Sequence, residues 1–507
     1  MHKSSSHDNL SRISAAAQRA ARAENWATVR DCTSEILKHD KRHPEAWFLT
    51  GLMEKAAGRN PQAVAAFSQS LQLDSRRSDA AIELANLCQL FLRNREAIAL
   101  LQRYMPILAE NAHYLDLAGS IYTRLGLHDK AWPLYRKANE LQPDIDHFQE
   151  NLAACATALG KTVQASELYH ALLSRHPGQQ RSHYHLACLE RAQDSTHIEW
   201  MKQVLDSSRL PAEQNVYLYS AIAKELEDLG QWQESFDYYS LAADAAGSSS
   251  GVTGEIALID RIIEVCNPAW LEKWARKATS KYRSKSPVFI VGFPGSDTRQ
   301  TERIVASHSK VESADETTYL PMIIKRAGGA GLNQDMSPEI IDAAAKKEVE
   351  FISNGYLDAM DYRLHGYPMF TDCLPANFLY LGFIAKSFPD AQFIHVQRNP
   401  MDACFAMYKQ PALSFAHSID SLADYYLAHD RLLHHWRKVL GNRLIELNFD
   451  VLLDDPETQI RDLLRRLELD FEPACLEQLP ETAAFSSWKN WESQLQPLKE
   501  RLKHDGL

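Results

Sequence analysis

Small and large side chains recur with a fixed period in the first half of this 507-residue chain. Four blocks align without gaps at a spacing of 34 residues, beginning at residues 44, 78, 112 and 146. In each block the eighth position is small, the twentieth is alanine, and the twenty-fourth is large and apolar or aromatic. Block by block, these residues are Gly51, Ala63 and Phe67; Ala85, Ala97 and Leu101; Gly119, Ala131 and Tyr135; Ala153, Ala165 and Tyr169. The pattern predicts repeated helix pairs in which small residues allow close approach and the bulky residue fills the space beside them.

Two further features identify the kind of repeat. Trp47 and Gly51 form a W-x-x-x-G start, and residues 125–143 read LGLHDKAWPLYRKANELQP. Proline at the thirty-second position, as in Pro143 and Pro177, is expected to end the second helix. Together these features resemble the tetratricopeptide repeat, whose unit has about 34 residues.

Degenerate copies extend the array at both ends. One precedes the four blocks, at about residues 10–43, and another lies near 216–246. A fifth start in register falls at residue 180, where Glu199 replaces the alanine of the twentieth position. The resemblance implies an α-solenoid with a concave groove over residues 10–246.

The first helices of the repeats supply the side chains that would line such a groove. The candidates mix polar and aromatic residues and form no basic stripe: Phe48, Asn86, Asp116, Ser120, Glu150 and Tyr184. One interpretation is a groove for a peptide or a partner protein. The other is a scaffold that packs on the next domain or forms a homodimer, because a fold alone does not give a function.

The hydrophobic pattern changes after residue 287. Short β-type runs appear at 288–293, 391–397 and 443–449, and long amphipathic helical patterns at 422–440 and 456–469 separate or follow them. Strands that alternate with helices predict an α/β domain built on a parallel sheet. In such sheets ligands bind beyond the carboxyl ends of the strands.

A break separates the two halves. AAGSSSG (Ala245 to Gly251) has the composition of a flexible linker, and residues 254–280 read as a helical connector interrupted at Pro268. We therefore expect a repeat solenoid at 10–246, a linker with connector helices at 247–286, and an α/β domain at 287–507.

Composition narrows the classes of function. The net charge of −11 argues against nucleic-acid binding, which needs a basic surface. The eight cysteines have no C-x-x-C spacing, so we expect free thiols in a reducing compartment and no zinc site. The polar N-terminus lacks an apolar signal core, and we expect no membrane span. A soluble cytoplasmic protein is the simplest interpretation.

The stretch PVFIVGFPGSDTRQTER (287–303) has the layout of a phosphate loop, with an apolar strand, a Pro/Gly/Ser turn and a helix start. Four more motifs follow in order: DCLPANFLYLG (372–382), RNPMDACFAMY (398–408), FDVLLDDPE (449–457) and EPACLEQ (472–478). In this order they resemble a sulfotransferase domain, distantly that of the tyrosylprotein sulfotransferases. The resemblance implies a P-loop-type α/β fold and 3′-phosphoadenosine 5′-phosphosulfate (PAPS) as sulfuryl donor, without a metal.

The resemblance also implies roles for residues of this chain. Ser296 and Thr298 would hold the phosphosulfate at the helix N-terminus, and Arg398 the 3′-phosphate. Glu316 would be the general base that removes the proton of the acceptor hydroxyl. Apart from the resemblance, Arg299 and Arg303 lie four residues apart on one helix face and are candidates to replace a cation that the loop lacks.

This sequence departs from the family pattern on the donor side. Gly295 stands where the family has an arginine, Asp297 where it has a glycine, and Cys373 where it has a lysine. Ala406 stands in place of a serine, and the tail segment 481–491 lacks a donor-binding arginine. Because each charge-assisted hydrogen bond contributes about 1.5–3 kcal/mol, these losses predict much weaker donor binding.

Two hypotheses follow from different classes of protein. The domain is either a non-catalytic binding or assembly module or an active PAPS-dependent sulfotransferase acting on a hydroxyl of a protein, peptide or other acceptor. A third idea is a different anionic ligand held by Arg299, Arg303 and Arg398, and Lys409 is another candidate cation. Arg398 also has a purely structural interpretation, as the partner of Asp402 at a strand–helix junction.

Overall fold

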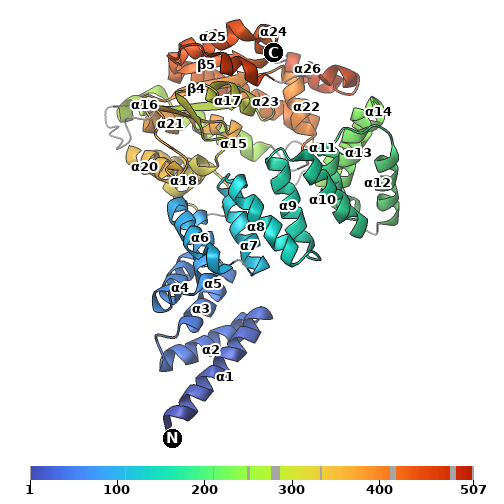
Figure 1. Ribbon diagram of the computed structural model, residues 1–507. Coiled ribbons are helices and arrows are strands. Elements are labelled where there is room, and N and C mark those ends of the chain that lie inside the picture. Colours follow the sequence, from blue (N-terminus) through green and yellow to red (C-terminus); the bar gives the residue numbers. More distant parts are fainter. Residues whose placement is uncertain are drawn as a thin grey trace. The chain divides into compact units, whose positions relative to one another are not determined.

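The structure is a computed structural model that describes residues 2–108, 110–208, 210–247, 252–275, 286–331, 334–411, 418–479 and 487–504 (Figure 1). It forms two compact units, Met1–Leu172 and Leu173–Leu507. Parts of the predicted linker, residues 248–251 and 276–285, lie outside the described residues. The three-part division of the chain stays a prediction.

The first unit consists of consecutive helices that pack as neighbouring pairs (Figure 1). Their bounds are α1 His2–Arg22, α2 Trp26–His39, α3 Pro44–Ala56, α4 Asn60–Leu73, α5 Ser78–Leu90, α6 Asn94–Leu108, α7 Ala112–Arg124, α8 His128–Leu141, α9 Asp146–Ala158 and α10 Thr162–Arg175. Helices α3, α5, α7 and α9 begin at the predicted block starts, residues 44, 78, 112 and 146. The repeat prediction is therefore confirmed to the residue.

The close packing within a pair explains the small eighth position. A Cβ atom added to Gly51 would lie 2.5 Å from the ring of Phe67, and one added to Gly119 would lie 2.7 Å from the ring of Tyr135. Both rings come from the twenty-fourth position of the same block. The aromatic ring thus fills the space that a side chain at the glycine position would need, as the spacing of the two residues predicts.

The second unit begins with further helices of the array. These are α11 Gln180–Leu189, α12 Thr196–Ser207, the short η1 Ala212–Gln214, α13 Val216–Asp228 and α14 Trp232–Ala246. The starts at 180 and 216 agree with the predicted copies. Two connector helices follow, α15 Thr253–Val265 and α16 Pro268–Ala275.

Five parallel strands form the sheet of the second unit, in the order β2-β3-β1-β4-β5. Their bounds are β1 Ser286–Gly292, β2 Val311–Ser313, β3 Met369–Asp372, β4 Gln392–Gln397 and β5 Leu444–Asn448. The hydrophobic runs predict β1, β4 and β5. They do not predict β2 and β3, which have only 3 and 4 residues and no clear run of their own. The chain leaves β1 toward β2 and leaves β4 toward β5, so the gap between β1 and β4 is the topological switch point.

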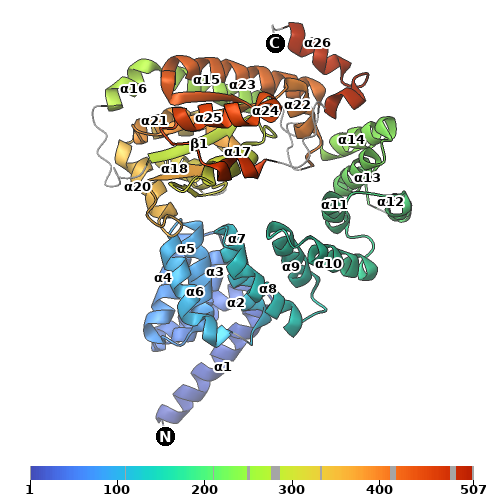
Figure 2. The ribbon, with the colours of Figure 1, turned by 45° about the horizontal axis from the view of Figure 1, so that its top comes forward.

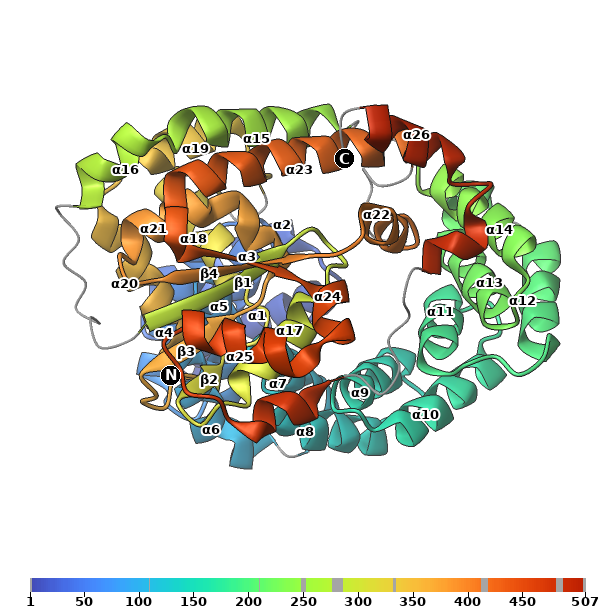
Figure 3. The ribbon, with the colours of Figure 1, turned by 90° about the horizontal axis from the view of Figure 1, so that it is seen from above.

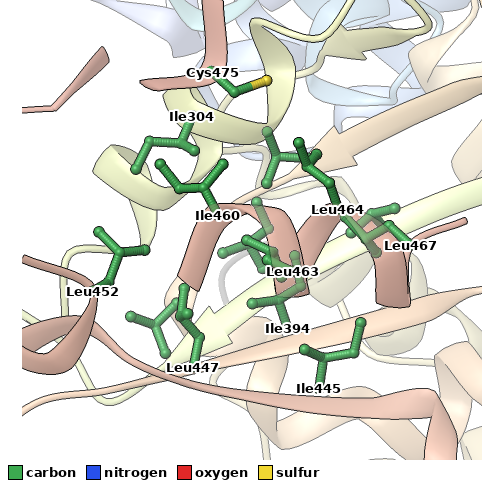
Figure 4. Packing of buried hydrophobic residues seen from close by; sticks show 14 of the residues in the cluster. Ile304, Ile394, Ile445, Leu447, Leu452, Ile460, Leu463, Leu464, Leu467 and Cys475 are labelled. Carbon is green, nitrogen blue, oxygen red and sulfur yellow. The ribbon is translucent and has the colours of Figure 1, made fainter. Parts of the chain in front are cut away.

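One face of the sheet carries an aliphatic core (Figure 4). Helices α17 Thr298–Ala306, α24 Phe449–Asp454 and α25 Pro456–Arg466, with η5 Pro473–Gln478, contribute to it. In Figure 4, Ile394 and Leu447 of the sheet meet Ile460 and Leu463 of α25. This packing fixes α17, and with it the loop between β1 and α17.

Further helices of this unit include the long α23 Ile419–Leu440, with α21 Leu381–Ser387 packed on it (Figure 2). The others are α18 Tyr319–Ala327, α19 Pro338–Ala345, α20 Val349–Met360 and η2 Pro375–Tyr380. Helix α15 lies along α23 (Figure 3). Strand β4 alternates between the two faces: Ile394 and Val396 join the aliphatic core, whereas His395 approaches His429 of α23.

The last repeat pair is packed on the α/β domain. Phe236 of α14 stacks with Phe405 and Tyr408 of α22 Pro400–Tyr408, and Trp232 meets Trp491 edge to face at 4.9 Å. The indole N–H of Trp491 also donates to the Trp232 carbonyl at 2.8 Å. Trp491 belongs to η6 Ser487–Trp491, which leads into the final helix, α26 Gln496–His504.

Candidate functional site

The predicted site residues gather at the carboxyl edge of the sheet. Ser296 and Thr298 follow β1, Glu316 follows β2, and Arg398 follows β4 directly. Because the strands are parallel, their carboxyl ends meet at one edge. The loop after β1 and the start of α22 therefore meet at the switch point between β1 and β4.

The loop after β1 has two residues in the left-handed region. Gly295 has φ 86° and Asp297 has φ 62°. Aspartate tolerates this conformation better than most residues, although glycine adopts it at lower cost. A Cβ atom at Gly295 would lie 3.2 Å from the Ala406 Cβ, so an arginine would be strained in this loop geometry. The two departures from the family pattern, Gly295 and Ala406, are thus packed against each other.

Asp297 binds the predicted phosphate arginine. Arg398 Nη1 lies 2.8 Å from Asp297 Oδ2, and the Arg398 side chain is only 16% exposed. Desolvation raises the pKa of the Asp297 carboxyl, although the positive charge of Arg398 acts in the opposite direction. The Asp297 carboxylate therefore lies where an anionic ligand would contact Arg398.

A second carboxylate, which the motif analysis does not identify, faces the same arginine. Asp450 Oδ1 lies 3.8 Å from Arg398 Nε, and Asp450 Oδ2 accepts a hydrogen bond from the Asn399 backbone N–H at 2.9 Å.

The predicted pairing of Arg398 with Asp402 was wrong. Asp402 instead accepts hydrogen bonds from Ser487 Oγ and the Trp488 backbone N–H. Arg398 therefore does have structural ion-pair partners, but they are Asp297 in the loop after β1 and Asp450 after β5.

The candidate replacement cation and the candidate base bind each other. Arg299 Nη2 lies 3.2 Å from Glu316 Oε2 and 3.8 Å from Asp315 Oδ1. The Arg299 side chain is 60% exposed and that of Glu316 35% exposed, so water screens this pair. Arg303 is exposed on α17.

The end of β3 is part of the core. Cys373 is fully buried, which raises the pKa of its thiol and fits a packed, unreactive cysteine. The preceding Asp372 accepts hydrogen bonds from Thr317 Oγ1 and Tyr356 Oη, both at 2.7 Å. Burial raises the pKa of Asp372 to about 6.

Lys409 is committed to the packing of the last repeat. Its Nζ lies 3.0 and 3.2 Å from the two carboxylate oxygens of Glu227 in α13. The rings of Phe405 and Trp491 lie 5.1 and 5.5 Å from the same nitrogen, within the range of a cation–π interaction. Lys409 thus joins the repeat helices to α22.

The groove candidates of the repeats also bind neighbouring repeats. Asn86 accepts a hydrogen bond from Arg124, and Asp116 accepts one from Asn151 at 2.8 Å. Phe48 is buried, with the Arg77 guanidinium 4.7 Å from its ring centre. These side chains connect consecutive first helices along the array.

The tail segment predicted to lack the donor arginine is described only in part. Residues 480–486 lie outside the described residues. Beyond them Trp488 is buried, and its backbone N–H donates a hydrogen bond to Asp402 Oδ1 at 3.0 Å. The segment is therefore anchored to the start of α22.

A pair of histidines completes the edge, and the motif comparison misses it. His395 of β4 and His429 of α23 line a cavity of about 410 Å³ that also touches Ser296 and Arg398. The signal in the sequence was a histidine at an inward position of the apolar run 391–397. The strand pattern alone does not indicate which residues this histidine contacts.

Metal and membrane features can be judged only in the described part of the chain. There, no three His, Cys, Asp or Glu side chains come close enough to hold a metal ion. No described helix combines the length and apolar character that crossing a membrane requires.

Comparisons with known proteins agree with this architecture. Residues 287–473 match the sulfotransferase family. An uncharacterised protein of Aquifex aeolicus is 26% identical over 360 residues, which are 69% of this chain and 47% of that protein. The chain thus spans about half the length of this curated relative.

Solved structures similar to this chain include proteins described as tetratricopeptide repeat proteins. One from Parabacteroides merdae is 12% identical, covers 47% of this chain and 93% of its own, with a TM-score of 0.33. PilF of Pseudomonas aeruginosa is 20% identical and covers 42% of this chain and 94% of its own, with a TM-score of 0.32. YrrB, described as having an unusual peptide-binding site, is 15% identical to this chain. The match covers 40% of this chain and 96% of YrrB, with a TM-score of 0.30.

The 34-residue helix pairs and the parallel five-stranded sheet lead to one assignment. The chain combines 34-residue helix pairs that resemble tetratricopeptide repeats with a C-terminal parallel-sheet domain that matches the sulfotransferase family over residues 287–473.

Proposed function

We propose that this chain does not catalyse sulfuryl transfer and that its sulfotransferase family domain serves as a binding or assembly module. The observation that carries the proposal is the 2.8 Å pair between Asp297 and Arg398. An internal carboxylate on Arg398 competes with any phosphate that would bind there. The competition is effectively intramolecular, and a dissolved ligand must overcome it.

The other cations near the edge do not supply what PAPS requires. Sulfotransferases use this polyanionic donor, and its charge must be balanced by arginine or lysine. Arg299 faces Glu316 and Lys409 faces Glu227, whereas Gly295 carries no charge. Glu316, the candidate base, forms an ion pair with Arg299. The residues present therefore do not fit PAPS, and we derive no sulfuryl-transfer step.

The repeats supply the binding role in this proposal, with a protein or peptide as partner. The last pair, α13 and α14, is already used by the α/β domain through Glu227 and Phe236. The earlier pairs repeat a surface of linked polar side chains, such as Asp116 with Asn151. Stacked repeats of this kind present extended concave surfaces to their partners.

Titration with 3′-phosphoadenosine 5′-phosphate (PAP) by calorimetry tests the proposal. The wild-type chain should show no binding at millimolar PAP. The Asp297→Gly variant should gain binding, because it frees Arg398 and places glycine at a left-handed φ of 62°. Asp315→Gly is the matched control, since Asp315 also has a left-handed φ, of 58°, but faces Arg299.

The same titration separates the alternatives. Micromolar binding by the wild-type chain, lost in Arg398→Ala, would overturn the proposal and favour an active PAPS-dependent sulfotransferase. Binding of PAP in Asp315→Gly but not in Asp297→Gly would point to Arg299 and Arg303 as the anion site.

A further inference from the structure

The cavity beside the loop has the size of a ligand site. Its volume of about 410 Å³ lies within the range of about 300–1,000 Å³ that is typical of small-molecule pockets. The end of β4, the loop after β1, and helices α22 and α23 enclose it. It extends from Ser296 and Arg398 to Leu433 of α23, on the opposite side of the sheet from the aliphatic core.

Uncharged polar atoms line this cavity without a protein partner. Among the described residues these atoms are Ser296 Oγ, both ring nitrogens of His395 and Nε2 of His429. Each of the three residues is at most 5% exposed. Because a buried polar group without a partner is costly, such atoms in an open cavity favour a hydrogen-bonding occupant.

The two histidines are neutral near pH 7. Burial lowers the pKa of His395 to about 4 and that of His429 well below its usual range. A backbone hydrogen bond with Gly292 uses one nitrogen of His429, and Nε2 is left as an acceptor. The cavity therefore offers acceptors at His429 Nε2 and at one nitrogen of His395, whose other nitrogen carries an N–H donor.

Aromatic rings form the walls around these nitrogens. Phe293 meets His429 edge to face at 5.3 Å and lies 5.0 Å from Tyr426. His395 is 5.5 Å from His429, with an angle of 34° between the rings. Walls of this kind favour a flat aromatic ligand.

The charges at the opening disfavour an anion. Arg398 and Arg437 line the cavity, and each is paired with a carboxylate, Asp297 and Glu446. Two further carboxylates, Asp430 and Asp450, line it as well. Carboxylates thus outnumber the arginines around the opening.

We propose that this cavity binds an uncharged heteroaromatic ligand that carries N–H donors. The ring packs beside the contacting rings of Phe293 and His429, and its donors reach His429 Nε2, His395 and Ser296 Oγ. This site adjoins the candidate donor site and shares Ser296 and Arg398 with it, but its ligand differs in charge. The proposal does not require that PAP binds, because His395 and His429 recognise the ligand through neutral nitrogens.

Ligand-observed NMR with benzamide and indole as probes tests the assignment. Both should bind the full chain with dissociation constants of about 1 mM, as expected for ligands with so few atoms. Benzoate has the shape of benzamide but is an anion, and it should bind at least tenfold more weakly. Toluene, which lacks N–H donors, should also bind more weakly.

Variants locate the bound probe. His395→Phe keeps an aromatic ring but removes both nitrogens, and benzamide binding should fall at least tenfold. Ser296→Ala removes one hydroxyl and should weaken binding several-fold. Tyr408→Phe, outside the cavity, is the control and should bind like the wild-type chain, and thermal unfolding verifies that each variant is folded.

The failures of the two proposals are distinguishable. Asp297→Gly should change PAP binding and leave benzamide binding unchanged, whereas His395→Phe should do the reverse. The cavity assignment is overturned if neither probe binds, if benzoate binds as well as benzamide, or if His395→Phe retains full affinity.

Discussion

Two neighbouring regions at the carboxyl edge of the sheet satisfy their polar groups in opposite ways. In the loop region, charged groups are matched within the chain: Arg398 by Asp297, and Arg299 by Glu316. In the cavity, both ring nitrogens of His395 and Nε2 of His429 have no partner among the described residues. A buried charge without a partner costs far more than a neutral group, so the charges are paired first. The loop region thus matches its charges inside the chain, whereas the neighbouring cavity leaves neutral groups unmatched.

Acid should destabilise the cavity region, and this is the largest effect we expect. The pKa of His395 is about 4 in the fold and near 6.5 in an unfolded chain, so between these values only the unfolded chain takes up the proton. Stability is therefore lost as the pH falls from about 6.5 to about 4, by about 3 kcal/mol for this group. Glu446, Arg437 and His429 are the titratable neighbours that modify this value.

Thermal unfolding between pH 7 and pH 4.5 measures this loss. His395→Phe should show a smaller fall in Tm than the wild-type chain over that interval. Equal falls in Tm for the two proteins would show that His395 is not a neutral, buried group.

Removing Arg398 should expose the dependence of the loop region on its pairs. Arg398→Met leaves the partly buried Asp297 carboxylate without its 2.8 Å partner, at a cost of about 2 kcal/mol. For a domain of this size the Tm should fall by about 4–8 °C. The double variant Arg398→Met/Asp297→Asn should recover much of the loss.

The matched control for this experiment is Arg299→Met. Its pair with Glu316 is largely exposed, so the change should cost under about 1 kcal/mol. A larger loss in Arg299→Met than in Arg398→Met would contradict the view that Asp297 and Arg398 form the principal pair.

Acid should open the loop region to anions. The pKa of Asp297 is raised by desolvation, so this carboxyl is protonated, and releases Arg398, at a higher pH than an ordinary aspartate. Sulfate keeps its charge in this range, and its affinity should rise as the pH falls from 7 toward 5, because a growing fraction of Asp297 is then protonated. Asp297→Asn should bind sulfate tightly at both pH values, and a wild-type affinity that does not vary with pH would argue against competition by Asp297.

The smallest effect should come from Ser296→Ala. The hydroxyl is fully buried and has no partner among the described residues, so its removal should change the free energy of unfolding by less than about 0.5 kcal/mol. Thermal unfolding measures this change. A loss above about 2 kcal/mol would mean that the hydroxyl holds the loop together, and it would not then be available to a ligand.

The sequence by itself determined the repeat architecture to the residue. The starts of α3, α5, α7 and α9 follow from a period that repeats every 34 residues. Helix pairs are stabilised by contacts between near neighbours, such as Gly51 with Phe67, and a linear pattern records such contacts directly. The strands β1, β4 and β5 could be predicted for a related reason, since each contains a short run of mostly apolar, buried residues.

Only the tertiary structure decided what the site residues do. Asp297 and Arg398 are separated by 101 positions in the sequence, and Glu227 and Lys409 by 182. No local pattern indicates such partners, because parallel strands bring distant loops together through their crossover connections. The sequence showed that a carboxylate had entered the loop and that cations had left it. Whether that carboxylate turned outward or bound Arg398 depended on the left-handed backbone at Asp297 and on the position of β4 beside β1. The meeting of His395 and His429 was decided in the same way, by α23 packing across the face of the sheet.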